Sequence, residues 1–312
     1  KTVGFVRASQ IITNCFNPLS AALGYKEGFM ITGKDIAIAA KKDLESFFED
    51  EANFTLNLEL DSNSVQHASV VGIGDKLRVR LSRDFCSAQV SGIDDLHYFL
   101  FVVSHEIAHY LHSHNEHKDE SDYDSKSVEA FADFFGARVM MTLLTYGQRF
   151  IEFYEELEFI FHSGDVLNSI GCAISRLAET LFNTRSDLYS NRITRVGHCS
   201  AGITSFLDKQ FSSINVQRSM DVLTRIYTAG NLPTIFKLEA EQFNMDPNLI
   251  LRSDEIHKNI QGIDLGITKG VKPFFAIFIG TSYSSTEASR NMQMSIRRSL
   301  AQKQGFDIPE LT

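Results

Sequence analysis

The chain has 312 residues, of which 43% are hydrophobic and 22% are charged. These fractions are close to the globular average, so they exclude a disordered or collagen-like protein. Thirty basic residues against 39 acidic residues give a net charge of −9. No basic patch is long enough to follow a nucleic-acid backbone, so we expect no nucleic-acid partner.

Cysteine usage and hydropathy indicate a cytoplasmic protein. The four cysteines, Cys15, Cys86, Cys172 and Cys199, form no CxxC pair. Such sparse cysteines favour free thiols in a reducing compartment over a disulfide scaffold. The first ten residues lack the apolar core of a signal peptide. No apolar run reaches the roughly 20 residues that a bilayer span needs, so we expect no membrane span.

The first part of the chain predicts one helix followed by a small sheet. Ile36, Ala40, Leu44 and Phe47 recur at helical spacing within residues 34–50. Apolar residues then alternate over 54–60, and two strand-like runs at 69–74 and 76–82 flank a Gly-Asp turn. These segments predict three strands of an antiparallel sheet.

From Asp94 onward the pattern is helical. Apolar residues cover most of the surface of the helix predicted over 94–113, so this helix is expected to be buried. An acidic loop leads to a second helix over 126–146, which ends at Gly147. Further helices are expected over 149–162, 166–182, 187–210, 214–229 and 284–303. The predicted fold class is α+β, predominantly α, with the small antiparallel sheet packed on this helix pair.

The buried helix contains an HExxH motif, formed by His105, Glu106 and His109. Residues four apart in a helix lie about 40° apart around its axis, so both imidazoles can face one ion. Neutral imidazoles suit Zn²⁺, and Glu106 lies beside the face that they share. The motif therefore predicts a zinc site with a carboxylate next to it.

The second helix offers a third ligand. Glu129 follows His109 by 20 residues, which is enough for the chain to turn back antiparallel, and Asp133 is one helical turn further. Asp133 is expected to accept the free N–H of a ligating histidine. Gly136 is two turns beyond Glu129 on the same face, and it indicates close approach of the two helices.

These motifs resemble those of gluzincin metallopeptidases, in which one helix supplies two histidine ligands and the next supplies a glutamate. The string EAFADFFGA, residues 129–137, is similar to the soluble relatives of the HtpX and CAAX-protease group, including Lit-type phage-exclusion proteases. Those families often carry a later T-H-P-x4-R-I segment. Residues 184–193 keep its Thr, Arg and Ile but lack His-Pro.

The resemblance implies a gluzincin-like catalytic domain over residues 1–205 and a helical region over 206–312 that regulates it or selects substrates. Zincins stabilise the oxyanion with a His, Tyr or Arg from beyond the second helix, and the candidates here are Tyr189, Arg192 and His198. Such peptidases hold substrate as a strand added at a sheet edge. The segment 76–82 is either that edge strand or an internal one.

Three further histidines, His112, His114 and His117, follow His109 near the end of the predicted helix, and a metal cluster of these four is the alternative to the HExxH site. Because they lie at a helix end and in an acidic loop, we expect their side chains to be solvated.

Together these features predict a zinc-dependent endopeptidase acting on a protein or peptide. His105, His109 and Glu129 hold Zn²⁺, and Glu106 is the general base for a metal-activated water. Two alternatives stay open. One is a latent host-defence or toxin-type protease that a protein trigger activates. The other is a non-catalytic regulatory protein with a vestigial metal site. The sequence leaves the oligomeric state open.

Overall fold

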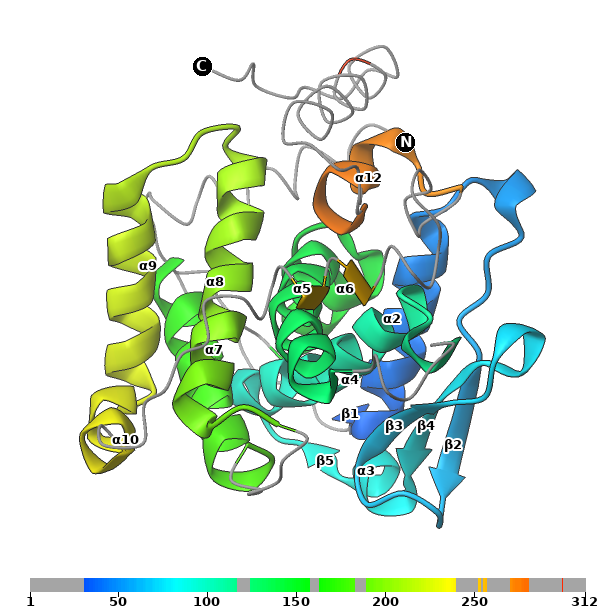
Figure 1. Cartoon of the computed structure of the whole chain (residues 1–312), viewed down its shortest axis with the longest axis horizontal. Coiled ribbons are helices and arrows are strands. Elements are labelled where there is room, and N and C mark those ends of the chain that lie inside the picture. The colour runs from blue at the N-terminus through cyan, green and yellow to red at the C-terminus, as the bar shows by residue number, and fades with distance from the viewer. Residues whose placement is uncertain are drawn as a thin grey trace.

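The computed structural model describes residues 31–116, 124–157, 163–182, 189–239, 252–253, 255–256, 270–280 and 299. Within these residues the chain is mainly helical, with a small sheet near its N-terminal end (Figure 1). This arrangement confirms the predicted α+β, predominantly α fold class. Of the helix predicted over 284–303, the structure describes residue 299 alone.

The helices follow the predicted order, with boundaries shifted by a few residues. Their bounds are α2 Gly33–Ser46, α3 Arg83–Ser87, α4 Ile93–Leu111, α5 Ser125–Tyr146, α6 Gln148–Glu156, α7 Ser163–Thr180, α8 Arg192–Gln210, α9 Val216–Ala229, α10 Leu232–Glu239 and α12 Pro273–Ile279. The short helices α3, α10 and α12 were not predicted. Three 3₁₀ turns are η1 Asp50–Ala52, η2 Gly74–Lys76 and η3 His114–Glu116.

The sheet is mixed, which corrects the antiparallel prediction for one strand pair. Its strands are β2 Leu58–Ser62, β3 Ala68–Val71 and β4 Arg78–Ser82, whereas β1 Ile31–Thr32 and β5 Gln89–Val90 pair antiparallel as a separate two-stranded sheet. β3 and β4 form the predicted antiparallel hairpin, but β2 pairs with β4 in parallel, in the order β2-β4-β3. Val79 and Leu81 of β4 are fully buried, whereas the side chains of β2 and β3 are partly exposed or exposed. The most buried of these three strands therefore occupies the centre, where both of its edges are paired.

The segment 76–82, left open as an edge or an internal strand, is thus internal. β2 and β3 are the edge strands of this sheet. β3 is the edge strand that packs against α4 (Figure 1).

α4 and α5 lie side by side at the centre of the molecule (Figure 1). Gly136 of α5 allows this, because a Cβ there would lie 2.9 Å from Cα of His105. The predicted close approach is confirmed, and it occurs at the first histidine of the HExxH motif. Gly202 of α8 faces α5 in the same way, since its Cβ would lie 2.1 Å from the carbonyl oxygen of Phe134.

One hydrophobic core joins the two sides of the α4–α5 pair. It includes Ile36 of α2, Leu100 of α4, Phe135 of α5, Ile174 of α7 and Ile226 of α9. The predicted boundary at 205 falls within α8, and the core continues past it. The role of the region beyond 205 stays a prediction.

Cys86, Cys172 and Cys199 carry free thiols, as predicted, and Cys15 lies outside the described residues. No helix in the described part of the chain is long and apolar enough to cross a bilayer. The cytoplasmic location stays a prediction.

Candidate metal centre

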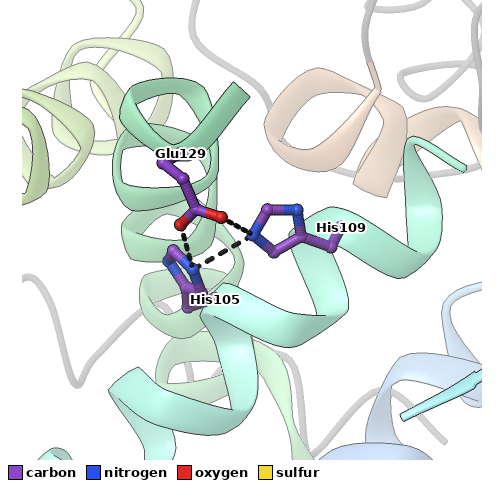
Figure 2. A group of neighbouring side chains, drawn as sticks. All are labelled: His105, His109 and Glu129. Carbon is purple, nitrogen blue, oxygen red and sulfur yellow. Dashed lines mark hydrogen bonds and ion pairs between the residues drawn. The ribbon is translucent and has the colours of Figure 1, made fainter. Parts of the chain in front are cut away.

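His105 and His109 of α4 and Glu129 of α5 point toward one another across the helix pair (Figure 2). The two Nε2 atoms lie 3.1 Å apart. Nε2 of His105 is 3.2 Å from Oε2 of Glu129, and Nε2 of His109 is 3.5 Å from Oε1. The three residues predicted as ligands therefore form a group that can hold a metal ion.

The donor set fits a metal ion in both spacing and chemistry. Two ligand atoms about 2.1 Å from a tetrahedral zinc ion lie about 3.4 Å apart, close to the separations seen here. Oε2 of Glu129 is buried, and its nearest polar neighbour among the described residues is Nε2 of His105, itself one of the three candidate ligand atoms. A buried carboxylate oxygen needs a positive partner, and either a proton on His105 or a bound cation would supply one.

Asp133 makes the contact predicted for it. Its Oδ1 lies 3.1 Å from Nδ1 of His105, so His105 is held with Nε2 facing His109 and Glu129. Asp133 is only 3% exposed, and its charge is balanced by Arg195 of α8. Nε and Nη2 of Arg195 each donate to a different oxygen of Asp133 at 2.8 Å.

Arg195 was not predicted. It lies one turn after Arg192, on which the sequence pattern placed the candidate role, and it shares a face of α8 with Gly202 seven residues later. The sequence does contain a signal for this ion pair: Arg195 and Gly202 share one face of α8, and Asp133 lies on α5. The ion pair can be inferred from this pattern only when the packing of α8 on α5 is known.

Glu106 is set apart from the three donor residues and faces a cavity of about 290 Å³ that His105 also lines. Burial raises the pKa of Glu106 above its ordinary value, although the neighbouring histidines act in the opposite direction. Burial also raises the pKa of Glu129, but His109 and His105 bring it well below the ordinary value. Glu129 therefore stays ionised, as a metal ligand must, whereas Glu106 holds a proton more readily.

The pKa of His105 is set mainly by two neighbouring carboxylates, Asp133 and Glu129. Burial lowers its pKa, yet the hydrogen bonds to Asp133 and Glu129 overcome this and raise it to about 10. In the metal-free chain a proton on His105 therefore balances these two carboxylates. A metal ion at the same place would replace that proton.

Of the three oxyanion candidates, Tyr189 is the one that lines the cavity. The charge of Glu129 is the largest influence raising the pKa of Tyr189, and the guanidinium of Arg195 lies 4.9 Å from the Tyr189 ring centre. Arg192, at the start of α8, and His198 are not among the described residues that line it. Residues 184–188, the first half of the segment compared with T-H-P-x4-R-I, lie outside the described residues.

The histidines that follow the motif differ from the prediction. His112 and His114 are 0% and 1% exposed, so the expectation that they are solvated is wrong. His112 packs against the rings of Phe131 and Phe135. Nδ1 of His114 lies 2.6 Å from Nδ1 of His109. η3 folds back under the helix end, which local sequence does not reveal, and His117 lies outside the described residues.

Comparisons with family models, with curated proteins and with solved structures found no match to this chain. We therefore infer the function from the geometry of the site.

Proposed function

We propose that this protein is a zinc-dependent endopeptidase with a gluzincin-like helix pair. The observation that carries the proposal is the position of Glu106, next to a ligand residue and facing the same cavity as His105, yet outside the donor group. A purely structural metal site has no use for such a carboxylate. A hydrolytic site needs one as general base.

Zinc is the ion that the donor set favours. Two imidazoles and one carboxylate that leave a coordination position open are the ligand pattern of catalytic zinc sites. Bound there, zinc supplies Lewis-acid chemistry, which polarises a peptide carbonyl and makes water more acidic.

The chain's own residues have separate roles in this proposal. Glu106 takes a proton from the attacking water and passes it to the leaving amine, and its raised pKa suits both steps. Asp133 fixes the ring of His105 through Nδ1. Tyr189 is the residue that we assign to the oxyanion, because it is the one of the three candidates that lines the cavity.

The lining of the cavity suits a substrate with an apolar side chain next to the scissile bond. Its lining includes apolar residues from α4, from α7 and from the two residues after α7, namely Phe101, Val102, Leu177, Leu181 and Phe182. Residues 65–68 line the side that leads to β3. A peptide held along β3 can therefore place one side chain against this wall.

The proposal is tested by metal analysis of the purified protein together with cleavage of casein. We expect about one zinc per chain and new peptide termini, and we expect the Glu106→Gln variant to keep zinc but not cleavage. Zinc without cleavage, until a protein trigger is added, would favour the latent host-defence alternative. Protein without zinc, which gains none on reconstitution, would contradict both the metal site and the peptidase.

A further inference from the structure

β3 has one edge inside the sheet and one edge outside it. Towards β4, Ser82 N–H donates to the carbonyl of His67 at 2.9 Å, and Ala68 and Val70 lie opposite Leu81 and Val79. In an antiparallel pair the backbone groups of successive residues point alternately toward and away from the partner. The N–H and C=O groups of Ala68 and Val70 therefore point away from β4.

The beginning of this outer edge opens on the candidate active site. Ala68 lines the cavity together with His105 and Glu106, and β3 packs against α4. Within the described part of the chain, the backbone N–H and C=O of Ala68 have no hydrogen-bond partner. An extended peptide can pair with this residue while it lies over the site.

The far end of the same edge is already occupied. The side-chain amide of Asn115 donates to the carbonyl of Val70 at 3.1 Å and to that of Gly72 at 3.2 Å. These two carbonyls are two residues apart, so both belong to the outer edge. Asn115 thus occupies the two carbonyl oxygens to which the next part of an added strand would donate.

The two neighbours of Asn115 in η3 make separate contacts of their own. Glu116 Oε1 accepts a hydrogen bond from Gly74 N–H at 3.0 Å, in the turn between β3 and β4. His114, on the other side, contacts His109. The three residues of η3 therefore connect the end of α4 to the outer edge of β3.

On the basis of the endopeptidase function above, we propose that Asn115 sets the length of the substrate-binding edge. A peptide pairs with Ala68 as an added strand and then leaves the edge before Val70 and Gly72, whose carbonyls Asn115 holds. The preferred substrate is an extended peptide that is recognised through few backbone contacts on that side of the scissile bond. Residues beyond that point bring no further gain in binding.

The experiment uses zinc-loaded full-length protein. A sequence cleaved in casein is identified by mass spectrometry, and synthetic peptides around it are shortened one residue at a time from each end. In the wild type, kcat/KM should stop rising with length early on one side. In Asn115→Ala the freed carbonyls should accept one more residue there, with a gain of about 2- to 10-fold per added hydrogen bond. The other side should not change.

Two further variants separate this effect from loosening of η3. Asn115→Asp keeps the shape but has no N–H to donate, so it should behave like Asn115→Ala. Glu116→Ala releases the hairpin turn but leaves Asn115 in place, so it should keep the wild-type length dependence. Zinc content and thermal unfolding show that each variant is folded.

The outcomes distinguish this proposal from the proposed function. Cleavage by the wild type with the same length dependence in Asn115→Ala overturns the role of Asn115 and leaves the peptidase standing. A length dependence that changes equally in Glu116→Ala overturns it as well. Absence of any cleavage by the zinc-loaded wild type, with or without a trigger, overturns both.

Discussion

Asp133 and Arg195 form a buried bidentate ion pair, with two guanidinium nitrogens each 2.8 Å from a carboxylate oxygen. The same carboxylate contacts Nδ1 of His105. Burial favours protonation of Asp133, but Arg195 brings its pKa below the ordinary value. Asp133 therefore stays ionised, and α8 contributes to the orientation of a candidate metal ligand on α4.

Asp133→Asn is expected to weaken zinc binding by about 10- to 100-fold, the usual effect of losing a group that orients a ligating histidine. The variant should also be less stable, because removing one partner of a buried ion pair costs about 3–5 kcal/mol. Zinc affinity by chelator competition and the free energy of unfolding in urea measure the two effects. Unchanged zinc affinity would contradict the role of Asp133.

A double variant separates these two effects. Asp133→Asn combined with Arg195→Gln leaves no unpaired charge, so part of the lost stability should return. Zinc affinity should stay low, because the carboxylate that orients His105 is still missing.

Gly136→Ala is expected to destabilise the protein, although alanine favours a helix interior by about 1 kcal/mol over glycine. The new Cβ would lie 2.9 Å from Cα of His105 and 3.0 Å from the carbonyl oxygen of Ser104. Backbone atoms cannot yield as a side-chain end can, so α4 and α5 must separate at the candidate metal site, at a cost of about 1–3 kcal/mol. Urea unfolding and zinc affinity should both show the loss.

Gly197→Ala is the matched control. Gly197 lies inside α8, and a Cβ there meets nothing within 4 Å among the described residues. This variant should be as stable as the wild type or more stable. Equal effects at the two glycines would show that helix propensity, and not the contact with His105, decides the result.

Local sequence was enough to predict α4, α5 and the residues that face each other between them. The spacing of His105 and His109 follows from helix geometry, and Glu129, Asp133 and Gly136 follow from one helix face. Arg195 and His114 could not be found in this way. Their roles depend on how α8 packs on α5 and how η3 turns back after Ser113, whose positive φ of 48° local propensity does not favour.

The same reason explains the error in the sheet. Alternation of apolar residues gives the strands and the turn between β3 and β4, but it does not say which strand lies between the other two. That choice depends on burial of Val79 and Leu81, a property of the assembled core.

His114→Ala is expected to lower zinc affinity by about 10- to 100-fold. A His109 ring that binds metal through Nε2 carries its proton on Nδ1, and Nδ1 of His114 lies 2.6 Å away to accept it. His114→Asn keeps an acceptor and should restore part of the affinity. Chelator competition and the visible spectrum of the cobalt-substituted protein report this effect. Equal affinities in all three proteins would show that His114 only fills space.

His97 predicts a pH dependence of stability. It is fully buried in α4 between Ser169 and Tyr154, whose hydroxyl groups lie 2.8 Å and 2.7 Å from its ring nitrogens. Burial lowers its pKa to about 3, whereas the unfolded chain binds this proton near pH 6.5. The contribution of neutral His97 to the free energy of unfolding is therefore complete above about pH 6.5. It is lost as the pH falls toward 3, by up to about 1.4 kcal/mol per pH unit.

His97→Gln keeps a neutral donor and acceptor but has no proton to bind. The difference in unfolding free energy between wild type and variant should thus become smaller from pH 7 to pH 4. Groups common to both proteins cancel in this difference. Parallel pH profiles in urea would contradict the buried neutral state of His97.

The last prediction compares Glu106→Gln with Glu129→Gln, two isosteric changes of carboxylates at the same site. Glu106 lies outside the donor group, so its amide variant should keep about one zinc per chain. Because burial raises the pKa of Glu106, removing its charge should also leave stability unchanged or slightly higher. Glu129 belongs to the donor group, and a neutral amide is a poor zinc ligand, so zinc and activity should fall together.

Casein cleavage should then separate a general base from a ligand. In Glu106→Gln the rate should fall by about 10²- to 10⁴-fold with zinc retained, because an amide cannot accept the proton of the attacking water. In Glu129→Gln the loss of rate should follow the loss of metal and recover in part at high zinc concentration. Equal loss of zinc in both variants would mean that the roles of the two carboxylates are misassigned. Full cleavage by Glu106→Gln would rule out the general-base mechanism.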